Sequence, residues 1–304
     1  MKIKKVSIIG LGALGVLIGH QLSKKIPDLL VVADQGRIDR YEKDGVFSNG
    51  ERCHFQYVTP WQVVPPADLI IFAVKFNTLK EAIDGVRSHV GEQTILLSLL
   101  NGISSEDVIG RAYGMDKLVY CVAQGMDAVK TGNALTFTHN GQLCFGDWEP
   151  GIISEKVRAV DEFFSRTEIP HTVETQMQRK LWGKFMVNVG VNQVIAVFGD
   201  DYGSIQQSGE HRDFMIAAMR EVIALSAKEG IMLNEKDLDY WLGVIDGLNP
   251  QGKPSMRQDV EARRPSELEL FAGTVLRLCD KHGIKAPVNA MLYEKMRQIE
   301  SQQY

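Results

Sequence analysis

A glycine motif directly behind a short apolar run, at the start of the chain, limits the possible folds more than any other segment. Residues 6–9 read as a buried strand, and a G-x-G-x-x-G follows at once. In that context the first glycine permits a tight turn, the second lets the backbone approach a pyrophosphate, and the third lets the helix pack on its strand. The helix N-terminus offers free N–H groups to the phosphates. The alternative is a Gly-rich turn in an ordinary α/β domain. The residues predicted to bind a dinucleotide are Gly10, Leu11, Gly12, Ala13, Leu14 and Gly15.

The N-terminus has a superficial likeness to a secretory signal, because Lys2, Lys4 and Lys5 precede an apolar stretch. Signal regions favour Leu and Ala and end at a small-residue cleavage site. This stretch instead contains four glycines and continues into polar and basic residues. No other run approaches the ~20 apolar residues that span a bilayer. We therefore expect a cytoplasmic protein that makes no membrane contact.

Length and composition narrow the class of protein to which the chain can belong. A chain of 304 residues is expected to form two domains, since domains typically run ~100–200 residues. The net charge of −4 argues against a nucleic-acid partner, which would require a basic excess. Four scattered cysteines fit a reducing compartment. The seven histidines show no metal-ligand spacing, so we expect no metal site.

The first half of the chain alternates strand and helix patterns, and the second half is helical. Strands are expected at 6–9, 29–33, 69–74, 94–99 and 118–123, helices at 13–25, 77–87 and 153–164, and an antiparallel hairpin at 133–146. This predicts an α/β fold with a Rossmann-type doubly wound parallel sheet. Helical patterns follow at 175–198, 210–229, 234–245, 256–263, 266–282 and 288–302. We predict a dinucleotide-binding domain over 1–173 and an all-α substrate and catalytic domain over 174–304.

Three polar residues interrupt the nearly apolar helix predicted around 180–197. Lys184, Asn188 and Asn192 stand four residues apart, along one helix face. A buried lysine is costly unless it is paired or lines a wet cavity, and buried amides need partners too. The asparagines could bond to nearby backbone while Lys184 reaches the surface. Three such residues on one stripe, behind a dinucleotide motif, favour a substrate pocket.

A second polar segment, 255–267, reads as two short helices separated by Pro265, which cannot lie inside a helix. Ser255-x-x-Gln258 fits a capping box. Glu267 falls in the first turn of the following helix, where the helix dipole favours the ionised carboxylate. Taken alone, this segment can be purely structural.

Together these motifs resemble the ketopantoate reductase (2-dehydropantoate 2-reductase) family. The glycine motif alone is weak; the lysine–asparagine stripe combined with Ser-Met-x-Gln-Asp is specific. The matching pieces keep their order over almost the whole chain: Gly-Leu-Gly-Ala-Leu-Gly at 10–15, Ala-Val-Lys at 73–75, Asn-Gly at 101–102, Leu-Trp-x-Lys-x-x-x-Asn-x-x-x-Asn at 181–192, Ser-Met-x-Gln-Asp at 255–259, Arg-x-x-Glu at 264–267 and Gly273.

The resemblance implies reduction of a 2-oxo acid to a 2-hydroxy acid by a nicotinamide cofactor, with (R)-pantoate as the family's product on the route to pantothenate and coenzyme A. It implies that Lys184 is the general acid and that Glu267 contacts hydroxyls at the reacting centre. Substrate-binding residues are implied to be Asn188, Asn192 and Ser255. Cofactor contacts are implied at the strand-end residues Lys75 and Asn101. The apolar helical domain is a candidate for a homodimer interface.

The choice of cofactor is open. The family implies NADPH, whose 2′-phosphate usually meets a basic residue after the second strand. This chain has Asp34 there, and an acidic residue at that point bonds the ribose 2′-OH of NADH. Arg37 and Arg40 follow closely enough to supply a phosphate site.

Two further departures concern the substrate. Tyr202 and Gly252 stand where the family pattern leads us to expect substrate-contacting asparagines, although Asn249 is nearby. They leave open another bulky branched or aromatic 2-oxo acid as substrate. The rival outside enzymes is a dinucleotide-sensing protein without turnover, against which the intact lysine–asparagine stripe argues.

Overall fold

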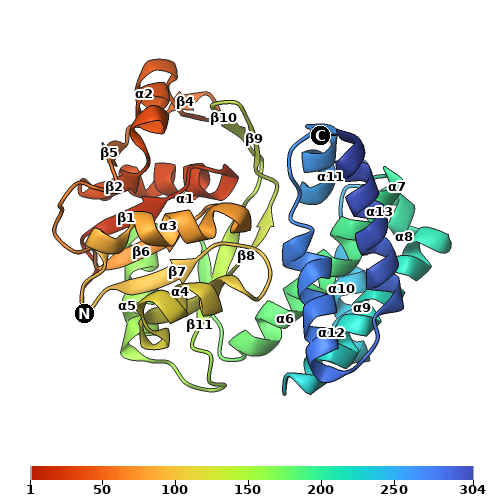
Figure 1. The fold of residues 1–304 in the computed structure, drawn as a ribbon. Coiled ribbons are helices and arrows are strands. Elements are labelled where there is room, and N and C mark those ends of the chain that lie inside the picture. The colour runs from red at the N-terminus through yellow and green to blue at the C-terminus, as the bar shows by residue number, and fades with distance from the viewer. Residues whose placement is uncertain (1, 304) are drawn as a thin grey trace. The chain divides into compact units, whose positions relative to one another are not determined.

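The computed structural model of the chain describes residues 2–303, which form two compact units (Figure 1). The first unit takes the chain up to Asn101 together with Ser105–Met177. The second takes Gly102–Ser104 and the chain from Gln178 onward. The chain thus leaves the first unit at Met177, and the domain boundary after residue 173 stays a prediction from the sequence.

An eight-stranded sheet in the order β12-β11-β8-β7-β6-β1-β2-β5 forms the first unit. Six strands run parallel: β1 (Val6–Ile9), β2 (Leu29–Val32), β5 (Gln56–Val58), β6 (Leu69–Phe72), β7 (Ile95–Ser98) and β8 (Leu118–Met126). β11 (Asn140–Gly146) is antiparallel to β8, and β12 (His171–Val173) is parallel to β11. All four residues of β6 are buried, as expected of a strand covered on both faces. The predicted Rossmann-type sheet is confirmed, with a mixed edge.

Helices cover both faces of this sheet. They are α1 (Ala13–Ser23), α2 (Gln35–Asp44), α3 (Leu79–Gly85), α4 (Ser105–Tyr113) and α5 (Glu155–Thr167), with 3₁₀ turns η1 (Phe76–Thr78), η2 (Arg87–His89) and η3 (Met115–Lys117). On one face, Ile18 of α1 and Phe163 of α5 share a core with Ile8 of β1. The next residue, Ile9, points to the other face and lies against Gly85 of α3.

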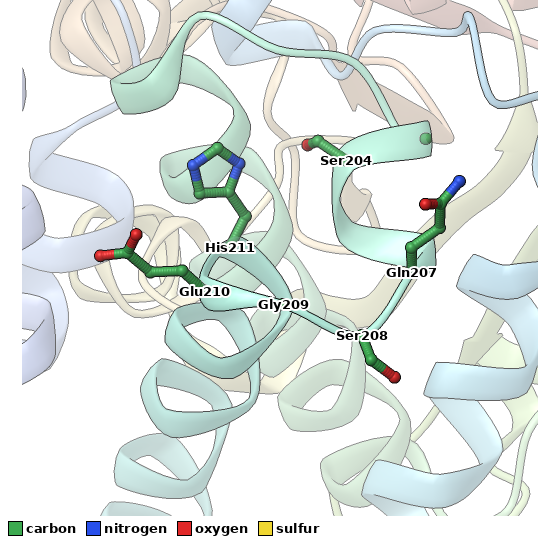
Figure 2. Close-up of a pocket in the computed structure, with 7 residues that line it drawn as sticks. Ser204, Gln207, Ser208, Gly209, Glu210 and His211 are labelled. Atoms are coloured by element: carbon green, nitrogen blue, oxygen red, sulfur yellow. The ribbon is translucent and has the colours of Figure 1, made fainter.

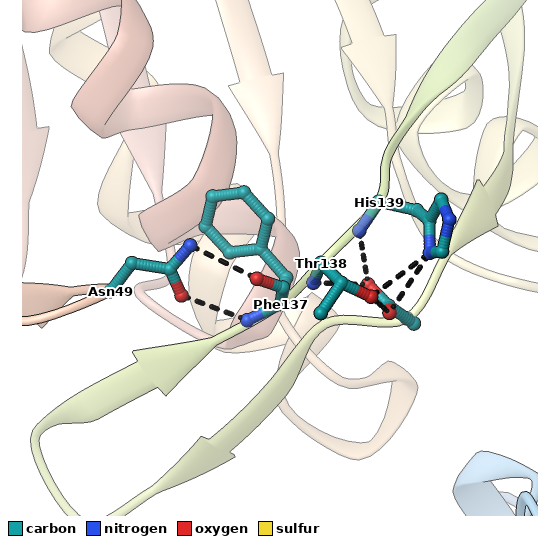
Figure 3. A network of polar contacts seen from close by, with 5 residues as sticks. Asn49, Phe137, Thr138 and His139 are labelled. Atoms are coloured by element: carbon teal, nitrogen blue, oxygen red, sulfur yellow. Dashed lines mark hydrogen bonds and ion pairs between the residues drawn. The ribbon is translucent and has the colours of Figure 1, made fainter.

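A second sheet, in the order β4-β3-β10-β9, overturns the hairpin predicted over 133–146. Its strands are β3 (Phe47–Ser48), β4 (Glu51–Arg52), β9 (Val129–Thr131) and β10 (Ala134–Thr136). β10 pairs back onto β9, whereas β11 joins β8 of the large sheet. Side chains fix the segment between them (Figure 3): Asp127 accepts from the backbone amides of Thr138 and His139, and Asn49 pairs with both backbone groups of Phe137. The hairpin prediction was wrong because β10 and β11 belong to different sheets, and no local sequence pattern marks that division.

The second unit is helical, which confirms the predicted α/β fold with an all-α C-terminal part. Its elements are α6 (Met177–Val187), the π-helical η4 (Asn188–Asn192), α7 (Gln193–Phe198), α8 (Gly203–Gln206), α9 (Glu210–Lys228), α10 (Glu235–Asp246), α11 (Ser255–Glu261), the π-helical η5 (Glu269–Gly273), α12 (Thr274–His282) and α13 (Pro287–Gln303). The helix predicted over 175–198 is therefore interrupted by a π-turn, and the one over 266–282 begins with another.

One segment contradicts the expectation that no further run is apolar enough to span a bilayer. Within residues 2–303, the helical segment Met177–Phe198 has the length and the apolar composition of a helix that could cross a membrane. Of its most apolar window, 72% is buried inside the structure, as in a core helix of a globular unit. Its composition is therefore weak evidence for membrane insertion.

A buried histidine makes the stability of the first unit depend on pH. His89 is fully buried, and its Nδ1 lies 2.8 Å from Ser7 Oγ of β1. Burial lowers the pKa of His89 below its ordinary value of 6.5, so the folded protein keeps the ring neutral. As the pH falls below about 6.5, the unfolded chain takes up a proton that the folded chain resists. The stability is therefore full above that pH and declines below it.

We expect the free energy of unfolding to fall between about pH 6.5 and about pH 5.5 by up to about 1 kcal/mol for this one proton. His89→Gln keeps a hydrogen-bonding partner for Ser7 and does not titrate there, so it should flatten the dependence. Urea unfolding at several pH values measures it. His54→Gln, at an exposed histidine, is the control and should keep the wild-type slope. Equal slopes in both variants would contradict the assignment to His89.

Candidate active site

The glycine motif lies where the order of the parallel strands reverses, with β6 on one side of β1 and β2 on the other. The last residues of β1, β2, β6 and β7 are in register, so these strands end at one level of the sheet. Ligands of such sheets bind beyond the carboxyl ends of the strands at this switch point. The structure places four predicted cofactor positions just beyond these four strand ends: Gly10, Asp34, Lys75 and Asn101.

The three glycines of the motif are under different structural constraints. Gly10 has φ +96°, and a Cβ there would lie 2.7 Å from the backbone carbonyl of Ala73. A Cβ on Gly15 would lie 1.9 Å from the Gly10 carbonyl oxygen, so only glycine lets α1 start this close to β1. Gly12 meets only the Ala73 oxygen, at an ordinary 3.5 Å. It is exposed, and no side chain caps α1 there. Packing does not require this glycine, whereas close approach of a phosphate does.

The other three motif residues pack into the protein. Leu11 is buried in a small core with Val16 of α1 and Leu135 of β10. Ala13 and Leu14 are partly buried against the same core. Their side chains are committed to packing, so a contribution to cofactor binding would come from their backbone.

Asp34 caps α2. Its Oδ1 accepts a hydrogen bond from Arg37 N at 2.9 Å, and its Oδ2 lies 3.3 Å from Arg37 Nε. Its side chain is 51% exposed, so the carboxylate is accessible at the end of β2. Arg40 Nε donates to the carbonyl of Gly36. Both arginines that could serve a 2′-phosphate thus have partners within the cap and helix α2.

A buried carboxyl group that the sequence did not reveal supports the loop at Asn101. Leu100 N donates to Ser98 Oγ, which lies 2.8 Å from Ser105 Oγ. Ser105 Oγ donates in turn to Glu106 Oε2 at 2.8 Å. Burial raises the pKa of Glu106 to about 7. In the sequence, Glu106 looks like an ordinary acidic residue in the first turn of a helix, so no pattern marks it.

In the second unit, three predicted substrate residues meet through hydrogen bonds. Asn192 Nδ2 donates to Asn188 Oδ1 at 3.2 Å. Asn192 Oδ1 accepts from Ser255 Oγ and from Met256 N, both at 3.4 Å. Asn188 Nδ2 is buried and has no hydrogen-bond partner among residues 2–303. An unsatisfied buried donor costs about 1–3 kcal/mol, so this group is suited to a ligand oxygen.

The predicted capping box at Ser255 is wrong. Ser255 is the first residue of α11, after the cap residue Pro254, which has no side-chain cap bond. The hydroxyl of Ser255 bonds Asn192 instead, and Gln258 Nε2 donates to the Lys253 carbonyl. A contact across 63 positions therefore replaces the local one.

Lys184 and Glu267 lie in the same unit, each within a few residues of one of two contacting π-helical turns, η4 and η5. Lys184 is partly buried on α6, four residues before Asn188, which corresponds to a rise of about 6 Å along the helix. Glu267 is partly buried two residues before η5, and η5 contacts η4. Their chemical roles stay predictions.

The two departures from the family pattern contact each other. Tyr202 N donates to the Gly252 carbonyl at 3.0 Å, and a Cβ on Gly252 would lie 2.9 Å from Tyr202 Cδ2. Burial raises the pKa of Tyr202 to about 12. The ring thus fills space that only glycine leaves free, in the loop that leads into α11 and Ser255.

A pocket of about 420 Å³ opens where α8 joins α9 (Figure 2). Its lining residues are Gly203, Ser204, Gln207, Ser208, Gly209, Glu210 and His211. None of the predicted site residues is among them. His211 Nδ1 lies 2.6 Å from Asp200 Oδ2, and its ring stacks on Phe198. Across the described residues, no three His, Cys, Asp or Glu side chains are grouped as a metal site requires.

We expect Gly12→Ala and Gly15→Ala to separate binding from folding. Gly15→Ala should lower the free energy of unfolding by at least about 2 kcal/mol, since its Cβ meets backbone. Gly12→Ala, at the N-cap of α1, should lower it by about 1 kcal/mol or less but weaken dinucleotide binding about tenfold. Urea unfolding and NAD(P)H fluorescence titration measure the two effects. Unchanged affinity in Gly12→Ala would mean that no phosphate group of the dinucleotide lies against this position.

Comparison with known proteins gives agreement over both units. A family model described as "Ketopantoate reductase PanE/ApbA" matches residues 6–150, and "Ketopantoate reductase PanE/ApbA C terminal" matches 176–300. The 2-dehydropantoate 2-reductase of Vibrio cholerae is 26% identical over 77% of this chain and 78% of its own. A D-mandelate dehydrogenase in complex with NADH has a TM-score of 0.88 at 20% identity, covering 99% of this chain and 100% of that one. The dimeric ketopantoate reductase of Staphylococcus aureus has a TM-score of 0.81 at 20% identity, with 99% and 100% covered.

Proposed function

Because the chain belongs to the ketopantoate reductase family, we propose that it reduces ketopantoate to (R)-pantoate with NADPH. As a family member it is an oxidoreductase that acts on CH–OH groups with NAD(P). The observation that supports a 2-oxo acid is the cluster of Asn188, Asn192 and Ser255, with its buried, unsatisfied Asn188 Nδ2. The carboxylate and ketone oxygens of such a substrate would satisfy that donor. A dinucleotide sensor without turnover would have no need of this cluster.

The residues at the strand ends fit a nicotinamide dinucleotide. The backbone of 10–15 would hold the pyrophosphate at the start of α1. Asp34 would meet the adenosine ribose, and Lys75 and Asn101 would add contacts beyond β6 and β7. When bound, the reduced nicotinamide supplies a hydride to the ketone carbon.

We assign the donation of a proton to the ketone oxygen to Lys184. Negative charge builds on the ketone oxygen as its carbon is reduced, and an ammonium group beside that oxygen stabilises the charge and donates a proton to it. Asn188, Asn192 and Ser255 would orient the 2-oxo acid through their hydrogen bonds. Glu267 would contact a hydroxyl group at the reacting centre.

Lys184→Ala should lower kcat by about 100- to 10,000-fold, the usual contribution of general acid catalysis. Binding of NADPH, followed by fluorescence, should remain within about twofold, because that interaction is assigned to the first unit. Lys180→Ala, one turn earlier on α6, is the matched control and should keep the wild-type kcat. An undiminished kcat in Lys184→Ala would remove this lysine from the mechanism.

NADH is the alternative cofactor, and the surroundings of Asp34 favour it. The exposed carboxylate would repel a 2′-phosphate and accept a hydrogen bond from a 2′-hydroxyl. The nearby Arg37 is already paired with that carboxylate. NADPH is supported by the family resemblance alone.

Asp34→Asn isolates the charge, since asparagine is as good a helix cap as aspartate. We expect the ratio of kcat/KM for NADPH to that for NADH to rise about tenfold or more, because a like-charge contact is removed. Asp39→Asn, on the same helix, is the control and should leave the ratio unchanged. An unchanged ratio in Asp34→Asn would mean that the carboxylate does not face the ribose.

A second substrate is favoured by the packing of Tyr202 on Gly252. An aromatic ring where two amides are expected presents fewer hydrogen-bonding groups and more apolar surface. This suits another bulky branched or aromatic 2-oxo acid, on the scaffold shared with D-mandelate dehydrogenase.

The deciding experiment is a steady-state comparison of ketopantoate, 2-oxoisovalerate and phenylglyoxylate with NADPH and NADH side by side. The highest kcat/KM for ketopantoate would support the primary assignment. A preference for phenylglyoxylate or 2-oxoisovalerate would support the alternative. Binding of NADPH without turnover of any of the three would favour the sensor.

A homodimer and a cytoplasmic location complete the proposal. A family relative from Staphylococcus aureus is dimeric. Sedimentation equilibrium of the purified chain decides the oligomeric state.

A further inference from the structure

The π-turn η4 is held by the side chain of the residue that follows it. In a regular α-helix, the Val189 carbonyl would accept from the backbone N–H of Gln193. Here Gln193 N donates to the Gly190 carbonyl instead. The Gln193 side chain supplies the Val189 carbonyl with a replacement donor, its Nε2, at 2.8 Å. Gln193 is fully buried, so no water competes for this contact.

A chain of hydrogen bonds connects this glutamine to two other helices. Gln193 Nε2 also donates to Asn289 Oδ1 of α13 at 3.1 Å. Asn289 Nδ2 donates to Glu221 Oε2 of α9 at 2.7 Å and to the Ala218 carbonyl at 3.2 Å. Glu221 also accepts the backbone N–H groups of Val288 and Asn289, at the start of α13.

The chemistry of the end groups fixes the orientation of both amides. An ionised carboxylate and a carbonyl only accept hydrogen bonds, so Asn289 must turn its NH₂ toward Glu221 and Ala218. Its oxygen then faces Gln193, which must present its own NH₂ to both Asn289 and Val189. Donation therefore starts at Gln193 and runs in two directions, to the Val189 carbonyl of the π-turn and through Asn289 to Glu221.

We propose that this Glu221–Asn289–Gln193 chain fixes the geometry of Asn188 and Asn192 and thereby sets the affinity for the 2-oxo acid. Asn188 and Asn192 are the first and last residues of η4. Gln193 directly follows the second, and the carbonyl that it holds directly follows the first. Gln193 is a positioning residue, since it acts through these asparagines. The inference rests on the proposed function of the two asparagines.

The test compares a variant that loses the Gln193 hydrogen bonds to Val189 and Asn289 with one that loses a single buried side-chain hydrogen bond to backbone elsewhere. Gln193→Met keeps the length of the side chain and removes the donor. Ser226→Ala is the matched control: its fully buried hydroxyl donates to the Ile223 carbonyl at 2.8 Å, within α9. Glu221→Gln is a milder second variant, because it keeps the side chain and one acceptor oxygen but places an NH₂ where the other oxygen accepts N–H groups.

Hydrogen exchange provides a readout that needs no activity. We expect the backbone amides of 188–194 to exchange faster in Gln193→Met, to a smaller degree in Glu221→Gln, and at the wild-type rate in Ser226→Ala. Unchanged exchange in both network variants would overturn the proposal, since the chain would not hold the turn.

Kinetics provide the functional readout. KM for the 2-oxo acid should rise at least about tenfold in Gln193→Met, because displaced orienting groups lose much of their effect. The fluorescence-determined affinity for NADPH should stay unchanged in all variants, and KM should stay unchanged in Ser226→Ala. Faster exchange with an unchanged KM, or an equal rise of KM in Ser226→Ala, would reduce the chain to a stability element. A wild-type protein that turns over no 2-oxo acid would overturn the proposed function itself, whatever the exchange result.

Discussion

The architecture of the first unit depends on a contact between two stretches of backbone, where α1 begins against the end of β1. A Cβ on Gly15 would come within 1.9 Å of the Gly10 carbonyl, so no other residue permits this approach. The contact sets the direction in which α1 leaves the sheet. It brings Val16 and Leu17 onto the small core that includes β10, and Ile18 and Leu22 onto the core shared with α5. It also leaves the first amides of α1 at the carboxyl edge of the sheet, which is the basis of the proposed cofactor cradle.

The sequence predicted those parts of the fold that local patterns determine. The buried apolar runs of the parallel strands and the glycine motif are contiguous, so the sheet and its cofactor edge were predictable. The partners of β10 and β11 were not, because the chain between them is fixed in part by Asn49, which lies 88 positions from Phe137. Helix α2 was missed as well: it is polar and begins directly after its cap residue Asp34, whose role as a cap looks in the sequence like a cofactor contact only.

In the second unit, too, the sequence predicted which residues lie on one helix face but not the local backbone geometry that holds them. The four-residue spacing placed Asn188 and Asn192 on one helix face, and their side chains are hydrogen-bonded to each other. Ser255, which the family resemblance added, bonds Asn192, and the binding roles of all three stay predictions. The π-turn that carries the asparagines could not be predicted, because it depends on Gln193, Asn289 and Glu221 from three helices. Glu106 and its hydroxyl chain in the first unit were hidden for the same reason. Which polar side chains are buried depends on their partners in three dimensions, and a single sequence does not show those partners.

The packing of Tyr202 on Gly252 also restricts the routes by which this sequence can diverge. A side chain introduced first at position 252 would meet the ring at 2.9 Å, whereas a smaller residue introduced first at 202 would remove that contact and leave the one with the Asn249 carbonyl, at 3.1 Å. The order of the two changes therefore affects how easily each is accommodated. Descendants of this chain reach an amide-lined loop more readily when position 202 changes first.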